Sequence, residues 1–324
     1  MPESLPQLSR ADPAAEGPWL PLLKGARNLI ADAAASCVAQ SPALEPAFIR
    51  LGKNLHDVPW FHTLYRRSRD TLVEKLKAKG DSIRKIRVHT VEILFDVSQF
   101  TVKRLYFLDS VYEPATTRLF LDEIVPNDVV LDVGANAGYF TLLAATRVGP
   151  AGRVYAFEPN PAVLVELKNH VALNHVEDRV TVVDAAVSDQ HESEADLFIS
   201  QTEDNSGLSS LIPTSDGLLN GVFDRGKTAR VRTISIDDWR VKAGCARIDW
   251  IKIDVEGFEE NVTRGMLKTL RATPVKGIIC ETRPQSPAYE ILLAQGYSAE
   301  RLGAADPHDW SNFLFRPRPR PAGN

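Results

Sequence analysis

The residues best suited to chemistry in this chain are glycines and carboxylates that stand where short apolar runs end. The first group is residues 132–138 (DVGANAG), which close the apolar run at 129–133. Glycines at such a turn permit backbone angles that other residues resist, and they let the main chain approach a ligand closely. Backbone N–H groups at the start of a following helix point to the same place. The segment predicts a ligand-binding turn, with these candidate contacts: Asp132, Gly134, Asn136 and Gly138.

An acidic residue, Glu158, closes the next apolar run, at residues 153–157. Its two carboxylate oxygens can accept hydrogen bonds from both hydroxyls of a ribose. A dinucleotide would place its pyrophosphate at the helix start, where Asp132 would repel it, whereas Asp132 would attract the α-ammonium of a methionine moiety. The pattern therefore favours S-adenosylmethionine over NAD as the cofactor. The alternative, in which the glycines only permit tight packing, stays open.

A third carboxylate, Asp184, follows the apolar run at residues 180–183. A carboxylate in that position could accept a hydrogen bond from the exocyclic amine of adenine. We therefore place Asp184 and Ala185 among the candidate cofactor contacts. An ordinary turn aspartate is the alternative interpretation.

The segment 248–259 (IDWIKIDVEGFE) joins an apolar strand to several acidic residues and a glycine. Asp254 stands at the carboxyl end of that strand, which is the sheet edge where Asp132 and Glu158 should also lie. Carboxylates that converge on one cleft repel one another, so some of their pKa values should rise or a cation should be held there. We predict Asp254 and Glu256 as catalytic residues, with Asp254 the first candidate for a base that accepts an alcohol proton. No residues have the spacing of a metal site, so no resident metal is predicted, although assistance through paired acids stays open.

Strands and helices that alternate along the chain must position these residues. The expected strands are 129–133, 153–157, 180–183, 250–253, 276–280 and 312–315, and expected helices include 114–124, 139–147 and one that starts at Pro161. Such alternation indicates βαβ units, and therefore an α/β fold in which a doubly wound, parallel sheet carries helices on both faces. Loops such as 190–230 are expected to contribute pocket walls.

The remaining segments suggest the domain organisation. Residues 1–17 read as a disordered lead and 18–85 as a helical N-terminal extension. Residues 86–111 alternate apolar and polar types, which predicts strands or hairpins leading into the core. The cofactor-binding domain is expected at 112–315, followed by a Pro/Arg tail at 316–324, which is unsuited to sheet pairing.

Composition narrows the class of protein. The chain has 324 residues, 44% of them hydrophobic, and a formal net charge of −4, so a packed core is expected and a nucleic-acid partner is disfavoured. Three widely separated cysteines suggest reduced thiols. Neither a signal peptide nor an apolar run long enough for a membrane span is evident, so a cytoplasmic location is expected. Oligomeric state is not encoded in any pattern we can identify.

Together these segments resemble the FkbM-type methyltransferase family. The matching segments are VVLDVGANAGYF (129–140), VYAFEPNP (154–161), AAVSD (185–189), SSL (209–211), TISIDDW (233–239) and IKIDVEGFE (251–259). The resemblance runs from about residue 112 to 315, roughly two thirds of the chain, and leaves out the first 90 or so residues. It implies a class I methyltransferase (Rossmann-like) fold with a mostly parallel, seven-stranded sheet. It also implies O-methylation with S-adenosylmethionine, on a small-molecule or glycan acceptor.

The resemblance implies roles for the same residues. The turn at 132–138 would bind the cofactor, Glu158 the ribose, and Asp184 with Ala185 would flank the adenine, while Asp254 would lie near the methionine end and the acceptor. Enzymes that methylate base amino groups resemble one another in an Asn/Asp-Pro-Pro-aromatic turn, where this chain has residues 254–257 (DVEG). That departure favours oxygen as the acceptor atom. The alternatives are an NAD-dependent oxidoreductase, a non-catalytic binding module that kept the fold, and an RNA methyltransferase.

Overall fold

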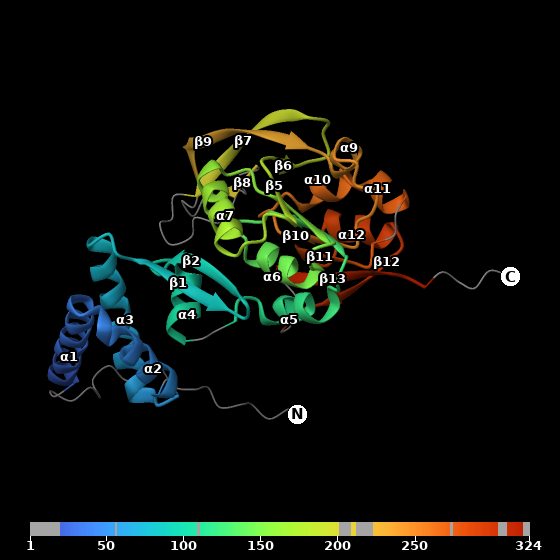
Figure 1. Ribbon diagram of the computed structural model, residues 1–324. Coiled ribbons are helices and arrows are strands. Elements are labelled where there is room, and N and C mark those ends of the chain that lie inside the picture. Colours follow the sequence, from blue (N-terminus) through green and yellow to red (C-terminus); the bar gives the residue numbers. More distant parts are fainter. Residues whose placement is uncertain are drawn as a thin grey trace, which may run out of the picture. The chain divides into compact units, whose positions relative to one another are not determined.

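The computed structural model describes residues 20–55, 57–108, 111–200, 209–211, 223–272, 275–303 and 310–319 (Figure 1). These residues divide into two compact units. The first comprises the described residues up to Ser82 together with 103–108, and the second comprises 83–102 and the described residues from 111 onward. The predicted disordered lead (1–17) and the last five residues of the predicted tail lie outside the described residues.

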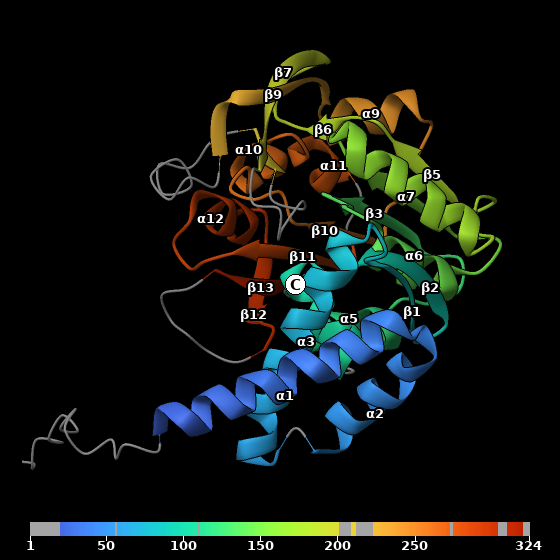
Figure 2. The same ribbon diagram turned by 90° about the vertical axis from the view of Figure 1, so that its left-hand side faces the viewer.

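The first unit is helical, as the apolar spacing of its sequence predicts. It contains α1 (Leu20–Gln40), the short helix η2 (Pro42–Leu44), α2 (Glu45–Leu55), α3 (Pro59–Ala78) and most of α4 (Phe100–Leu108). Pro59 begins α3, where its missing N–H has no helical partner to lose. α1 packs against α3 (Figure 2), with Ala31 and Ala35 of α1 and Leu72 of α3 fully buried.

A hairpin opens the second unit, with β1 (Ile83–Val88) and β2 (Val91–Asp96) paired antiparallel. Strands were expected throughout 86–111, and that prediction is wrong for its second half, which is α4. Val102 and Leu105 are both buried and stand three residues apart, which matches a helical period as well as a short strand pattern. Short apolar runs of this kind do not distinguish the two structures.

A seven-stranded sheet forms the centre of the second unit (Figures 1 and 2). Its spatial order is β12 (Tyr297–Arg301), β13 (Ser311–Pro317), β11 (Gly277–Thr282), β10 (Trp250–Ile253), β3 (Val129–Val133), β4 (Arg153–Phe157) and β5 (Val180–Val183). β13 runs antiparallel to both of its neighbours, and the other pairs are parallel. The predicted α/β class and doubly wound, mostly parallel sheet are confirmed. Strand order reverses beside β3, so the carboxyl ends of β3, β4 and β10 meet at the switch point.

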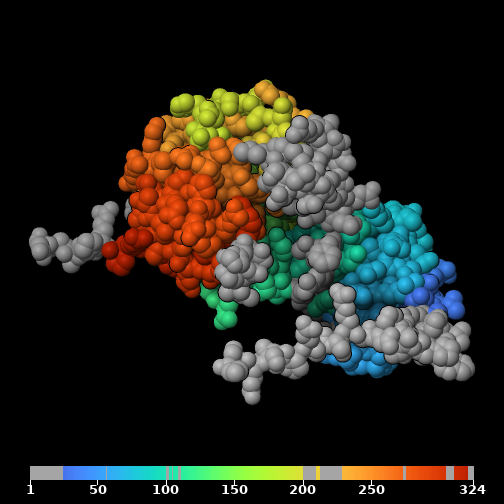
Figure 3. Space-filling view, turned by 180° about the vertical axis from the view of Figure 1, so that it is seen from behind, coloured from blue at the N-terminus to red at the C-terminus, as the bar shows by residue number. Residues whose placement is uncertain are grey.

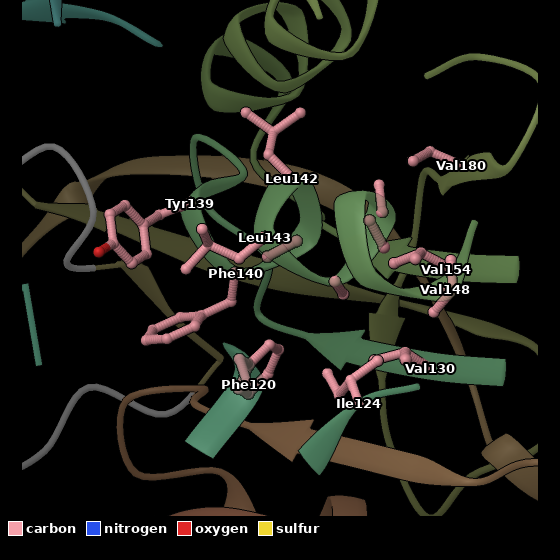
Figure 4. Packing of buried hydrophobic residues seen from close by; sticks show 14 of the residues in the cluster. Phe120, Ile124, Val130, Tyr139, Phe140, Leu142, Leu143, Val148, Val154 and Val180 are labelled. Atoms are coloured by element: carbon pink, nitrogen blue, oxygen red, sulfur yellow. The ribbon is translucent and has the colours of Figure 1, made fainter. Parts of the chain in front are cut away.

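Helices cover both faces of this sheet and bury it. α5 (Pro114–Glu123), α6 (Tyr139–Val148) and α7 (Pro161–Leu173) pack on one face over Val130 and Val154, as Figure 4 shows for part of this cluster. α9 (Ile236–Lys242), α10 (Glu259–Arg264), α11 (Leu267–Ala272) and α12 (Pro287–Ala294) cover the face that carries Leu131 and Ile251. Successive strand residues thus enter opposite cores, which explains why the strands read as continuous apolar runs.

A smaller sheet replaces the loops expected at 190–230. It has the order β6 (Ala186–Val187), β9 (Phe223–Ile234), β7 (Ser193–Ser200) and β8 (Ser209–Ser210). The loop prediction is therefore wrong for β7 and β9, which pair along most of their length. Among the described apolar residues of β7 and β9, only Leu197, Val231 and Ile234 are buried, and many charged residues lie between them, so the apolar alternation that marks a strand is weak there. In space-filling view the C-terminal part of the chain, orange to red, forms one surface beside the yellow residues of this sheet (Figure 3).

Within the part of the chain that the structure describes, every helix is too short or too polar to span a lipid bilayer.

Candidate active site

The turn between β3 and α6 holds the glycines that the sequence singled out. Gly134 and Gly138 have φ angles of +81° and +96°, and Asn136 between them has φ 51°. A Cβ atom on Gly134 would lie 1.8 Å from the backbone oxygen of Asp254. The turn therefore touches the carboxyl end of β10, and only glycine permits that approach.

Glu158 is held in place through both of its carboxylate oxygens, one of which binds this turn. Oε2 accepts a hydrogen bond from the backbone N–H of Asn136 at 2.9 Å, and Oε1 accepts one from the backbone N–H of Asn160 at 2.8 Å. The residue is only 7% exposed, and burial raises the pKa of its carboxyl to about 7 although both N–H groups oppose the rise. Each oxygen keeps a second lone pair for a further donor.

Asp132 lies beneath the turn and is 1% exposed. Its Oδ2 accepts a hydrogen bond from the Thr141 hydroxyl at 2.6 Å, which fixes the side chain against α6. Burial raises the pKa of Asp132, and the Lys252 ammonium opposes that rise. Thr141 thus occupies one carboxylate oxygen of Asp132, and the predicted contact with a ligand ammonium stays a prediction.

Asp184 and Ala185 follow β5 at the same edge of the sheet. Ala185 is fully buried, whereas the Asp184 side chain is exposed and its backbone oxygen accepts hydrogen bonds from Arg232 at 3.2 and 3.3 Å. Asp184 is close enough to Glu158 to contribute to the raised pKa of that carboxyl. Asp184 and Glu158 therefore lie near each other at the carboxyl edge of the sheet without a direct hydrogen bond between them.

Lys252 is a functional candidate that the sequence reasoning missed. It stands inside β10, is 2% exposed, and its Nζ lies 2.7 Å from Asp254 Oδ2 and 4.6 Å from the centre of the Phe140 ring. Burial alone would lower the pKa of Lys252, but nearby carboxylates, above all Asp254, outweigh it and raise that pKa. A lysine within a fully buried strand was the available signal, because a buried charge requires a partner.

Three carboxylates converge at the carboxyl ends of β10 and β11. Oxygens of Asp254, Glu256 and Glu281 lie within 4.8 Å of one another, a spacing that could hold a cation. Glu281 was not among the predicted site residues. It ends an apolar strand as Asp254 does, and that shared position was the signal that could have found it.

The pKa values of the three carboxyls shift in different directions. Burial opposes ionisation of Asp254, yet Lys252 and a hydrogen bond with Glu281 keep the pKa of Asp254 below its usual value. Burial, with the Asp254 charge in second place, raises the pKa of Glu281 and raises that of Glu256 to about 7. The expected repulsion among these acids is therefore present, and Lys252 determines which of them stays ionised.

Glu113 completes this polar cluster from a distant part of the chain. It precedes Pro114 at the start of α5 with φ 40°, and its Oε2 accepts a hydrogen bond from Asn312 Nδ2 at 2.8 Å. Burial raises the pKa of Glu113, and Lys252 opposes the rise. Neither Glu113 nor Asn312 was a predicted site residue, because 199 positions separate them.

Comparisons with known proteins show similarity to methyltransferases. The family model described as Methyltransferase FkbM domain matches residues 132–310. The chain is 28% identical over 243 residues to methyltransferase sdnD of Sordaria araneosa, covering 67% of this chain and 87% of that protein. It is 31% identical over 162 residues to the 31-O-demethyl-FK506 methyltransferase FkbM of Streptomyces tacrolimicus, covering 44% and 61%. It is 27% identical over 162 residues to the hexuronic acid methyltransferase AglP of Haloferax volcanii, covering 49% and 59%.

Proposed function

Since the chain belongs to the FkbM methyltransferase family, we propose that it is an S-adenosylmethionine-dependent O-methyltransferase acting on a hydroxyl of a small molecule or a sugar. One observation carries this proposal. The glycine turn, the ribose candidate Glu158 and the acids around Asp254 all lie at the carboxyl edge of one sheet, with Gly134 in contact with the Asp254 backbone. A cofactor held by the turn would reach the acids.

The residues of the turn suit the cofactor. Glu158 is buried, its orientation is fixed by two backbone N–H groups, and it has free lone pairs for the ribose hydroxyls. The positive φ angles of Gly134 and Gly138 allow the backbone to follow a ligand closely. We assign Asp132 and Asn136 to the same turn, and Asp184 with Ala185 to the neighbourhood of the adenine.

The bound cofactor supplies a methyl carbon on a sulfonium, which is electrophilic without help from the protein. The chain must hold an acceptor hydroxyl in line with that carbon, and positioning of this kind lowers the barrier by several kcal/mol. As the new O–C bond forms and the C–S bond breaks, the hydroxyl loses its proton. We assign that proton to Glu256, because a base with a pKa of about 7 is well matched to neutral conditions.

The sequence made Asp254 the first candidate for the base that accepts the proton, but in this proposal it has a different role. Its salt bridge with Lys252 keeps it ionised and makes it a weak base. It is better suited to accepting a hydrogen bond from the acceptor hydroxyl and to stabilising positive charge near the transferred methyl group.

Oxygen is the proposed acceptor atom for two reasons. The acids at residues 254–257 can accept hydrogen bonds from hydroxyls, and the turn there lacks the prolines that accompany methylation of base amines. The names of two relatives mention an O-demethylated substrate and a hexuronic acid, which are hydroxyl-bearing molecules.

Turnover is the direct test. The full-length protein should transfer a radiolabelled methyl group from S-adenosylmethionine to at least one member of a panel of alcohols and sugars, and to no member of a parallel panel of amines. The Glu256→Gln variant should bind S-adenosylhomocysteine like the wild type but transfer the label more slowly. If labelled amines form while no labelled ether does, the acceptor assignment is wrong.

A further inference from the structure

Two residues extend the polar site: Arg283, which directly follows β11, and Trp310, which directly precedes β13. These antiparallel strands place Glu281 opposite Asn312, and Thr282 opposite Ser311. Opposite residues share a face of the sheet, and faces alternate along a strand. Arg283 and Trp310 therefore follow on the face of Glu281 and Asn312. The guanidinium carbon of Arg283 lies 5.7 Å from the Trp310 ring centre, which confirms that the two side chains meet.

Asn312 carries an unused hydrogen-bond acceptor at this position. Its Nδ2 donates to Glu113, while its Oδ1 is buried and, among the described residues, has no hydrogen-bond partner. A buried acceptor without a donor is unfavourable, and a ligand hydroxyl or a water would relieve it. Because Glu281 is opposite Asn312 and near Asp254 and Glu256, this unused oxygen borders the proposed catalytic acids.

Trp310 lies further from the catalytic acids than Glu281 and Asn312 do along this face of the sheet, and it is 46% exposed. The face of an indole ring is electron-rich and attracts weakly positive C–H groups as well as cations. A sugar ring presents such C–H groups on one face and hydroxyls at its edge. The acids beyond Trp310 would accept hydrogen bonds from those hydroxyls but would repel the phosphate of a nucleotide.

We propose that Trp310, Asn312 and Glu281 form an acceptor subsite for a sugar ring. The indole of Trp310 packs against the C–H face of the ring, Arg283 holds the indole in place from its other side, and Asn312 Oδ1 accepts a hydrogen bond from one ring hydroxyl. A neighbouring hydroxyl then lies toward Asp254 and Glu256. This inference rests on the proposed function, and it narrows the acceptor from hydroxyl compounds in general to carbohydrates.

Saturation-transfer NMR tests the subsite on the full-length protein saturated with S-adenosylhomocysteine. The probes are methyl β-D-glucopyranoside, D-glucuronic acid, catechol as a diol that is not a sugar, and AMP. We expect transfer to the C–H protons of at least one sugar. Transfer to catechol or AMP alone, or to none of the four probes, would overturn the proposal.

Variants of Trp310 locate the binding. Trp310→Ala should weaken the affinity for the sugar by roughly fivefold to tenfold, the loss expected for one aromatic contact, and Trp310→Phe should restore part of it. The matched control is Trp60→Ala, which removes a tryptophan that is 70% exposed on α3 and should leave sugar binding unchanged. Sugar binding that survives Trp310→Ala would also overturn the proposal.

Calorimetry with S-adenosylhomocysteine separates the two proposals. If every variant binds that ligand and Trp310→Ala loses only the sugar, both proposals are supported. If the wild type binds S-adenosylhomocysteine but no sugar, the subsite is wrong and the proposed function stands. If the wild type does not bind S-adenosylhomocysteine, the proposed function itself fails.

Discussion

The assignment of Glu158 to the ribose predicts that cofactor affinity depends on pH. Burial raises the pKa of this carboxyl to about 7 in the free protein. Ribose hydroxyls donate hydrogen bonds, so they favour the ionised carboxylate over the neutral acid. Binding must therefore remove the proton from Glu158, and this costs progressively more free energy as the pH falls below 7.

The magnitude follows from the pKa. At pH 8 the carboxylate is mostly ionised already, whereas at pH 5.5 a group with a pKa of 7 is ionised in only about 3% of molecules. The dissociation constant for S-adenosylhomocysteine should rise by roughly 30-fold between these pH values, equivalent to about 2 kcal/mol. Calorimetric titrations at pH 8.0, 7.0, 6.0 and 5.5 would measure it.

Two variants determine whether Glu158 is the group that titrates. Glu158→Gln should bind more weakly at pH 8, by about 1–3 kcal/mol for a lost charged hydrogen-bond partner, and its affinity should be nearly independent of pH. Glu256→Gln removes a second carboxyl with a pKa of about 7 and should retain the wild-type slope. A flat wild-type profile, or the same slope in Glu158→Gln, would show that Glu158 is not the group that controls binding.

Three further predictions concern the corner where β3 meets β10. Lys252→Met should lower the free energy of unfolding by about 3–5 kcal/mol at pH 8, because it leaves buried carboxylates without their cation. Urea unfolding should show a smaller loss at pH 5. An equal loss at both pH values would contradict the role of Lys252 as the cation for these carboxylates. Asp254→Asn should slow methyl transfer while S-adenosylhomocysteine affinity stays within a few-fold, and unchanged turnover would remove Asp254 from the catalytic residues. Gly134→Ala should abolish cofactor binding or folding, because its Cβ would lie 1.8 Å from a backbone oxygen. The control is Gly149→Ala: Gly149 has a similar φ, but its Cβ would meet nothing within 4 Å, so the variant should cost only the backbone strain. Similar stabilities of the two variants by thermal unfolding would argue against the close approach.

The parts of the site that sequence predicts best are those that follow the ends of parallel strands. β3, β4 and β10 are short, buried on both faces and therefore recognisable as apolar runs. Parallel strands end at one edge, so Asp132, Glu158 and Asp254 had to lie near one another once the strands were identified. The fold class and this edge of the site were predictable for the same reason.

Other parts depend on contacts that no local pattern encodes. Lys252 is hidden within an apolar strand, and its importance appears only when Asp254 lies 2.7 Å from its ammonium. Glu113 and Asn312 meet only because α5 and β13 lie side by side in the folded unit. β7 and β9 bury little apolar surface, so their residues read as loop until their pairing is seen.

The central claim is that the turn at residues 132–138 and Glu158 bind S-adenosylmethionine. Calorimetric titration of the purified protein with S-adenosylhomocysteine, with NAD as the control, tests it most directly. We expect micromolar binding of S-adenosylhomocysteine and none of NAD. Binding of NAD alone, or of neither ligand, would contradict it.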